Sequence, residues 1–151
     1  MTASMAVHSW NEAAALERLI LSSLHAAHLF DEWVVLDHRS SDDTQATLDE
    51  LQPVLAAYGV TLRRLHEKRD LSRALTFVDV RNRTLKAAKN KVVALMDADF
   101  ILGPSFAGTL EEATRLITSG QATSVAFPTF VVWDYLTTDS EFWDLVPGPN
   151  E

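Results

Sequence analysis

Two aspartates, Asp97 and Asp99, stand one residue apart directly after an apolar run at residues 92–96. Such a run is typical of a buried strand, which would carry both carboxylates to its C-terminal end. In open α/β sheets, ligands bind at that edge. Carboxylate oxygens suit Mg²⁺ or Mn²⁺, and such a cation suits a diphosphate. The spacing therefore indicates a site for a nucleotide-activated substrate; the structural alternative is a strand end with solvated acids.

Other polar side chains follow or precede segments of similar character. A strand is expected at residues 6–10, and Glu12 comes shortly after it. A second strand, at residues 33–36, runs directly into Asp37. Arg81 opens the helix before the apolar run, and its planar guanidinium suits phosphate because it donates two parallel hydrogen bonds. These residues are the candidates for completing a site around the two aspartates.

The segments that must position these residues alternate between strand and helix patterns. Strands are expected at residues 6–10, 33–36, 60–65, 92–96 and 124–127, and helices at 16–27, 48–58, 78–89 and 105–119. The third strand alternates polar and apolar residues, which places it near a sheet edge. Strand and helix in alternation predict right-handed crossovers, and therefore an α/β fold with a mostly parallel sheet and helices on both faces.

Composition limits the function classes. The chain has 151 residues, 47% of them hydrophobic, which suits one globular domain. Its net charge of −8 argues against a nucleic-acid partner, and it would also repel a diphosphate unless a cation intervenes. The absence of cysteine excludes disulfides and thiol catalysis. Neither a membrane span nor a signal peptide is expected, and the expected location is cytoplasmic.

Four short motifs now stand in order along the chain. They read Trp-Asn-Glu at residues 10–12, Asp-His-Arg-Ser-Ser-Asp-Asp-Thr at 37–44, Arg-Asn at 81–82 and Asp-Ala-Asp at 97–99. Together they resemble the nucleotide-sugar-binding half of a GT-A glycosyltransferase of the family-2 type. That family reads Tyr-Asn-Glu, Asp-Asp-Gly-Ser-Thr-Asp-Gly-Thr, Ala-Arg-Asn and Asp-x-Asp. The later part is also similar to LARGE-type transferases, through Asp-Ala-Asp-Phe at 97–100 and Phe-Pro-Thr-Phe at 127–130.

The resemblance implies roles for individual residues. It implies a nucleotide-sugar site formed by Ser9, Trp10, Glu12, Asp37, Arg81 and Asp97, with Asp97 and Asp99 as the metal-site residues. Asp99 would ligate the cation directly, and Asp97 would contact the ribose or a metal-bound water. Trp10 would stack on the base, unless it is a core aromatic. Asp37 would accept hydrogen bonds from the base or ribose, unless it caps the following helix.

The implied function is transfer of a sugar from a nucleoside diphosphate sugar to an acceptor hydroxyl, with Mn²⁺ or Mg²⁺ as cofactor. A UDP-sugar is the expected donor. Two positions depart from the family pattern: His38 replaces the second acid after the second strand, and Arg39 replaces a glycine. Both positions bear on recognition of the base. No catalytic base is assigned, because the later acids stand in no recognisable motif.

The expected organisation is a GT-A domain at residues 1–133, followed by an acidic, aromatic tail at 134–151 that could begin an acceptor region. A partner chain, or a C-terminal region missing from this chain, would then complete the acceptor site. The alternative function is a non-catalytic GT-A-like nucleotide-binding module, or a subunit of a larger assembly. A nucleotidyltransferase is a third class, but the Gly-rich basic loop that it needs is absent from residues 8–12.

Overall fold

The computed structural model describes residues 2–67 and 77–126. The strands are β1 (Ala3–Ser9), β2 (Phe30–Asp37), β3 (Thr61–His66) and β4 (Val93–Asp97). The helices are α1 (Ala13–Ser23), the 3-10 helix η1 (Leu24–Leu29), α2 (Thr44–Ala57), α3 (Phe77–Ala87) and α4 (Phe106–Thr118). Every strand pair is parallel, and the strand order is β3-β2-β1-β4. Within the part of the chain that the structure describes, β3 therefore lies at an edge of the sheet, which agrees with the prediction for the third strand.

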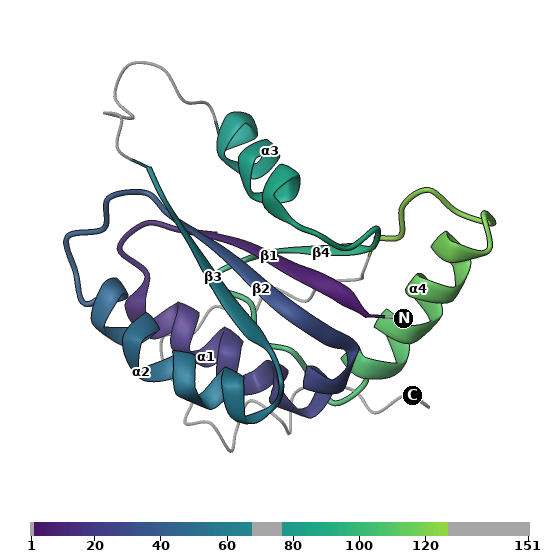
Figure 1. Ribbon diagram of the computed structural model, residues 1–151, viewed down its shortest axis with the longest axis horizontal. Coiled ribbons are helices and arrows are strands. Elements are labelled where there is room, and N and C mark those ends of the chain that lie inside the picture. The colour runs from purple at the N-terminus through teal and green to yellow at the C-terminus, as the bar shows by residue number, and fades with distance from the viewer. Residues whose placement is uncertain (1, 68–76, 127–151) are drawn as a thin grey trace.

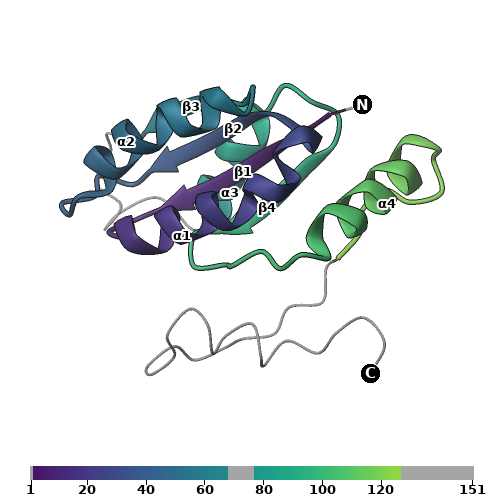
Figure 2. The same ribbon diagram turned by 90° about the horizontal axis from the view of Figure 1, so that it is seen from below.

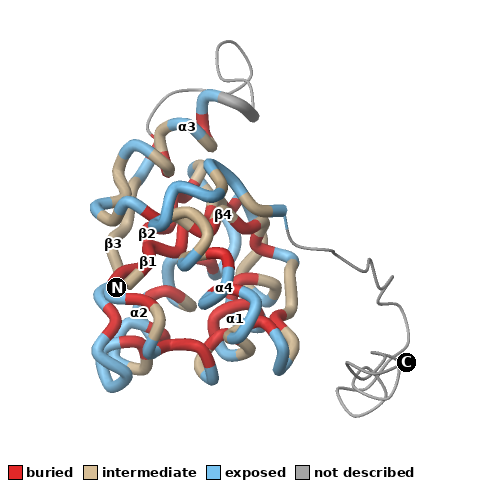
Figure 3. The backbone as a smooth tube through the Cα atoms, turned by 90° about the vertical axis from the view of Figure 1, so that its right-hand side faces the viewer, coloured by how far each residue is buried: buried red, intermediate tan, exposed pale blue. Residues whose placement is uncertain are grey.

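Helices cover both faces of the sheet, as predicted. Figure 1 shows α1 and α2 on one side of the strands and α3 on the other, with α4 at the side of β4. Figure 2 shows α1 and α2 lying side by side across the strands. In the tube of Figure 3, the buried segments gather where the strands meet α1 and α2. The larger apolar core therefore lies on the α1–α2 face, and within residues 2–67 and 77–126 the helix on the other face is α3.

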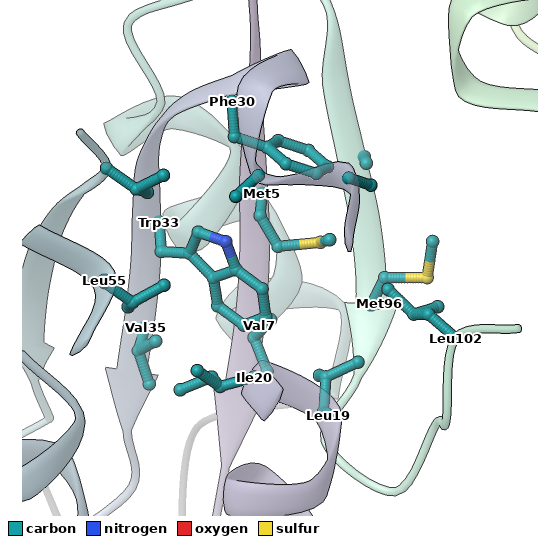
Figure 4. Close-up of a cluster of buried hydrophobic side chains, with 14 of the residues drawn as sticks. Met5, Val7, Leu19, Ile20, Phe30, Trp33, Val35, Leu55, Met96 and Leu102 are labelled. Carbon is teal, nitrogen blue, oxygen red and sulfur yellow. The ribbon is translucent and has the colours of Figure 1, made fainter. Parts of the chain in front are cut away.

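The core on the α1–α2 face is built around Trp33. This side chain is 1% exposed, and Figure 4 shows it among Met5, Ile20 and Leu55, which come from β1, α1 and α2. Because successive strand residues point to opposite faces, the apolar residues at every second position of β1 and β2 all reach this core. Burial of one large apolar side chain contributes about 2 to 3 kcal/mol. This packing fixes the sheet that carries the strand ends.

The α3 face is held by a buried polar network instead. Glu32 of β2 accepts hydrogen bonds through Oε1 from the Ser4 hydroxyl at 2.7 Å and from the Lys89 amide at 2.6 Å. Its Oε2 accepts from Arg63 Nη1 at 3.0 Å. Arg63 Nη1 also donates to the Ala87 carbonyl at 2.5 Å. The network therefore ties three strands to the connection between α3 and β4.

The prediction of a fifth strand at residues 124–127 is wrong for the residues that the structure describes. Residues 124–126 are not in a strand, and residues from 127 onward, including the expected segment at 130–133, lie outside the described residues. A segment forms a strand only where its backbone pairs with a neighbour. Here residues 123–125 line a cavity of about 240 Å³ with Val92, Ala94 and Leu110. This cavity lies at the start of β4, away from the strand ends that carry the candidate site.

Among the described residues, none of the helices has the length and the apolar character that a membrane crossing requires.

Candidate functional site

The predicted site residues meet at the C-terminal edge of the sheet because the strand register aligns them. Ser9 at the end of β1 pairs with Asp37 at the end of β2. His8 pairs with Asp97 at the end of β4. Since the strands are parallel and adjacent, these three ends and the loops after them form one edge. The sequence prediction that the motifs converge there is consistent with this register.

Asp97 lies on the α3 face, where Arg81 binds it and His8 lies nearby. Arg81 of α3 donates to its Oδ1. His8 Nε2 lies 3.8 Å from the same oxygen. The side chain of Asp97 is 38% exposed, so a ligand at the edge can reach its other oxygen. Asp99, two residues later, is exposed to solvent.

Glu12 brings a further carboxylate to the edge. Its partial burial raises the pKa of its carboxyl above the usual value, and the negative charges of Asp99, Asp97 and Asp42 raise it further. The amide of Trp10 donates to Glu12 Oε2 at 3.4 Å and opposes this shift in part. The mutual repulsion of these acids would be relieved by a cation placed among them.

The residues at this edge fit a hard divalent cation whose remaining ligands come from a substrate. Asp97 and Asp99 offer carboxylate oxygens, which are the donors that Mg²⁺ and Mn²⁺ prefer. In residues 2–67 and 77–126, no group of three His, Asp or Glu side chains is close enough to form a complete protein site. Mg²⁺ usually keeps several waters and binds through one or two carboxylates plus substrate phosphates. The donor set therefore suits a cation shared with a diphosphate.

Replacement of Glu12 tests this concentration of negative charge. Because the folded pKa of Glu12 is raised, its ionised form costs stability at neutral pH, and this cost disappears as the pH falls through that pKa. Glu12→Gln is therefore expected to raise the free energy of unfolding at neutral pH, without added metal, by up to about 1 kcal/mol after solvent screening. Urea unfolding measures this change in the free energy of unfolding. Glu17→Gln, at an exposed position on α1, is the control. A gain of equal size below the ordinary Glu pKa of 4.5 would contradict the explanation.

Ser9 and Asp37 are placed differently from Asp97. Their side chains point to the α1–α2 face, since they stand one register step from His8 and Asp97. Ser9 is fully buried, and Asp37 is 2% exposed. Asp37 accepts hydrogen bonds from the Ser40 amide at 3.1 Å and from Gln45 Nε2 at 2.8 Å. In this arrangement Asp37 organises the loop into α2, while its contact with a nucleotide stays a prediction.

Trp10 lies on the surface of the edge. Its side chain is 62% exposed, so it is not the core aromatic that was the alternative reading of this residue. An exposed indole beside a polar ligand site offers a flat face on which a base can stack.

Asn11 joins the two loops at this edge, a role that the sequence did not reveal. Its amide donates to Ser40 Oγ at 2.9 Å, and its side-chain oxygen accepts from the Ser41 amide at 2.7 Å. Nearby, Asp42 accepts from the Ala13 amide at 3.1 Å. The only sequence signal was the presence of polar residues with short side chains, which commonly bond to loop backbone. These bonds fix the loops after β1 and β2 relative to each other.

Two histidines line the α3 face beneath the edge; the sequence analysis gave His8 no role and noted His38 only as a departure from the family pattern. The rings of His8 and His38 have centroids 5.8 Å apart. Burial lowers the pKa of both imidazoles, and their mutual repulsion adds to this effect at His38. Both rings are therefore held toward the neutral form, and His38 occupies the position where the family pattern has an acid.

The parallel sheet, its helices and the polar residues at its C-terminal edge define a GT-A glycosyltransferase domain. Residues 4–131 match the model of glycosyl transferase family 2. This match spans more than half of the 151 residues, so the chain belongs to that family. No curated protein sequence matches the chain. The further similarity to LARGE-type transferases stays a prediction.

Solved structures share the fold. TarS residues 1–349 from S. aureus is 20% identical with a TM-score of 0.62, and the match covers 85% of this chain and 39% of that 1–349 segment. The mannosyltransferase PcManGT from Pyrobaculum calidifontis, in complex with GDP-Man and Mn²⁺, is 24% identical with a TM-score of 0.59. The match covers 76% of this chain and 32% of PcManGT. Glucosyl-3-phosphoglycerate synthase from Mycobacterium tuberculosis is 27% identical with a TM-score of 0.54. The match covers 75% of this chain and 39% of the synthase. The chain thus spans about two fifths of these proteins or less.

Proposed function

We propose that this chain binds a nucleoside diphosphate sugar together with Mn²⁺ or Mg²⁺, and transfers the sugar to an acceptor hydroxyl. The observation that carries the proposal is the placement of Asp97, Asp99 and Glu12 at one sheet edge, where burial raises the pKa of Glu12 and the charges of the two aspartates raise it further. A cation shared with a diphosphate would relieve that repulsion.

Structures of similar proteins support the donor class. TarS was solved in complex with UDP and with UDP-GlcNAc. Glucosyl-3-phosphoglycerate synthase was solved with Mn²⁺ and UDP. We therefore propose a UDP-sugar as the first donor to test, and GDP-Man as the second, since PcManGT was solved with it.

The residues of the edge would divide the work. Asp99 would ligate the cation, and Asp97 would contact the cation or the ribose. Arg81 holds Asp97 and has further donors for a phosphate, because a guanidinium carries five N–H groups. When bound, the cation would neutralise the charge of the departing diphosphate. Trp10, Glu12, Ser9 and Asp37 would surround the nucleoside.

Donor binding is tested by thermal shift and calorimetry with UDP, UDP-GlcNAc, GDP and GDP-Man, with and without Mn²⁺. Binding that stabilises the chain and needs the cation supports the proposal, because a ligand specific for the folded state raises its melting temperature. If none of the four nucleotides binds with Mn²⁺ or Mg²⁺ present, the proposed function is wrong.

A binding module is the second candidate function. The observation that favours it is that the chain spans 32% of PcManGT and 20% of TarS, so another segment or chain would supply the acceptor site. Slow, metal-dependent hydrolysis of UDP-GlcNAc or GDP-Man by the purified chain would support an enzyme. Tight binding with neither hydrolysis nor transfer, even when a broad panel of acceptors is offered, would favour the module.

Trp10→Ala is expected to weaken metal-dependent nucleotide binding about tenfold, because the variant loses the stacking surface for the base. Trp10→Phe should retain most of the affinity, since it keeps an aromatic face. Tyr58→Ala is the matched control. Tyr58 is also a largely exposed aromatic residue, but it lies between α2 and the start of β3, at the end of the sheet opposite the candidate site. Equal affinity for Trp10→Ala and Tyr58→Ala in calorimetry would exclude stacking by Trp10.

A further inference from the structure

The backbone of Arg39 has an unusual conformation at the candidate site. Its φ angle is 62°, in the left-handed region that glycine adopts easily and other residues rarely adopt. In the family pattern this position is a glycine. A bulky residue that replaces it costs the fold free energy. Strained positions of this kind cluster at ligand sites.

No contact of the Arg39 side chain with the described residues compensates for this strained backbone. Its side chain is exposed and makes no hydrogen bond or ion pair with the residues that the structure describes. The backbone on both sides is nevertheless fixed: the His38 amide donates to the Ser9 carbonyl at 2.9 Å, and the Ser40 amide donates to Asp37 at 3.1 Å. The loop therefore holds Arg39 in place and leaves the guanidinium in solvent at the edge.

The position of Arg39 indicates which part of a donor it would meet. It follows β2, and β1 lies between β2 and β4. Since neighbouring strands are about 4.8 Å apart, the loop after β2 stands roughly 10 Å along the edge from the end of β4. The cation and diphosphate are proposed at Asp97 and Asp99, at the end of β4. Arg39 therefore lies where the nucleoside of the donor is expected, away from the diphosphate. Trp10, in the loop after β1, lies between Arg39 and the end of β4.

We propose that Arg39 is a specificity-determining residue that reads the base, an inference that rests on the proposed function. A guanidinium only donates hydrogen bonds. At C4 of a pyrimidine or C6 of a purine it therefore suits a carbonyl oxygen, which uracil and guanine carry there; contact with the C2 carbonyl, which cytosine shares with uracil, would give no such discrimination. Cytosine and adenine carry an amino group at these positions, which would set donor against donor. Arg39 thus selects oxo bases over amino bases, and the strained backbone is the cost of presenting it.

The test compares binding of UDP, GDP, CDP and ADP to the full chain by calorimetry, with Mn²⁺ present. Wild type is expected to prefer UDP or GDP over CDP and ADP by about tenfold or more. Arg39→Gly should lose most of this preference by weakening the oxo bases. It should also raise the melting temperature by about 3 °C, because the left-handed conformation no longer carries a side chain. Arg39→Lys should keep part of the preference, since one charged donor remains.

Arg18→Ala, on the exposed side of α1, controls for loss of one positive charge. An equal loss of affinity for all four nucleotides in Arg39→Gly would identify a phosphate contact and overturn the base-reading role. An unchanged preference would also overturn it. Failure of wild type to bind any of the four nucleotides is a different result, because it contradicts the proposed function itself.

Discussion

Asp99→Ala is expected to lower the Mn²⁺-dependent affinity of the chain for UDP by at least about 100-fold. Asp99 stands in the loop after β4, where its exposed carboxylate is free to ligate a cation. The chain carries a net charge of −8, so a diphosphate that loses its cation also meets an unfavourable field. Calorimetric titration of UDP with and without Mn²⁺ measures the effect. The residual affinity of the variant should no longer depend on the cation.

Asp43→Ala is the matched control for this experiment. Asp43 is also an exposed aspartate in a loop at this edge, and its side chain makes no cap hydrogen bond to α2. Both variants should unfold within about 0.5 kcal/mol of wild type, because exposed side chains without partners contribute little to stability. An unchanged Mn²⁺-dependent affinity in Asp99→Ala would contradict the metal site. Equal losses in both variants would mean that net charge alone matters.

The sheet and its functional edge could be predicted because they depend on short-range patterns. The apolar run before Asp97 gave β4, and the run before Asp37 gave β2, each within a few residues of the observed ends. Alternation of strand and helix then requires parallel strands, and parallel strands bring their C-terminal ends to one edge. The shared edge of Asp37 and Asp97 follows from these two steps without knowledge of any contact.

The faces of the strands and the loop contacts could not be predicted in the same way. Ser9 and Asp37 point to one face and Asp97 to the other, because a single register step reverses a side chain. Predicting this requires the pairing register, which the spacing of motifs does not contain. The joining of the two loops by Asn11, and its positive φ of 55°, depend on tertiary hydrogen bonds between residues about 30 positions apart. The place of Asp99 at this edge could be predicted without the pairing register or the loop contacts, because Asp99 lies beyond the end of β4.

Glu32→Ala is expected to lower the free energy of unfolding by about 3 kcal/mol or more, although Glu32 lies at the opposite end of the sheet from the site. Its side chain is 4% exposed and accepts hydrogen bonds from Ser4, Arg63 and the Lys89 amide. The variant leaves the buried Ser4 hydroxyl and the Lys89 amide without this acceptor, and it removes the carboxylate partner of the half-buried Arg63 guanidinium, which is costly. Urea unfolding at neutral pH measures the loss. Exposed Glu50→Ala on α2 should stay within about 0.5 kcal/mol of wild type.

The pH dependence of Glu32→Gln separates the charge of Glu32 from its shape. Burial alone would raise the pKa of this carboxyl, but the hydrogen bonds from Lys89, Ser4 and Arg63 outweigh it and hold the pKa below the usual value of 4.5. A lowered folded pKa stabilises the fold fully above the unfolded value, and this stabilisation is lost as the pH falls through the folded pKa. The gap in unfolding free energy between wild type and Glu32→Gln should therefore narrow below pH 4.5. A constant gap would mean that the ionised carboxylate does not hold the α3–β4 connection, and with it the placement of Arg81 against Asp97.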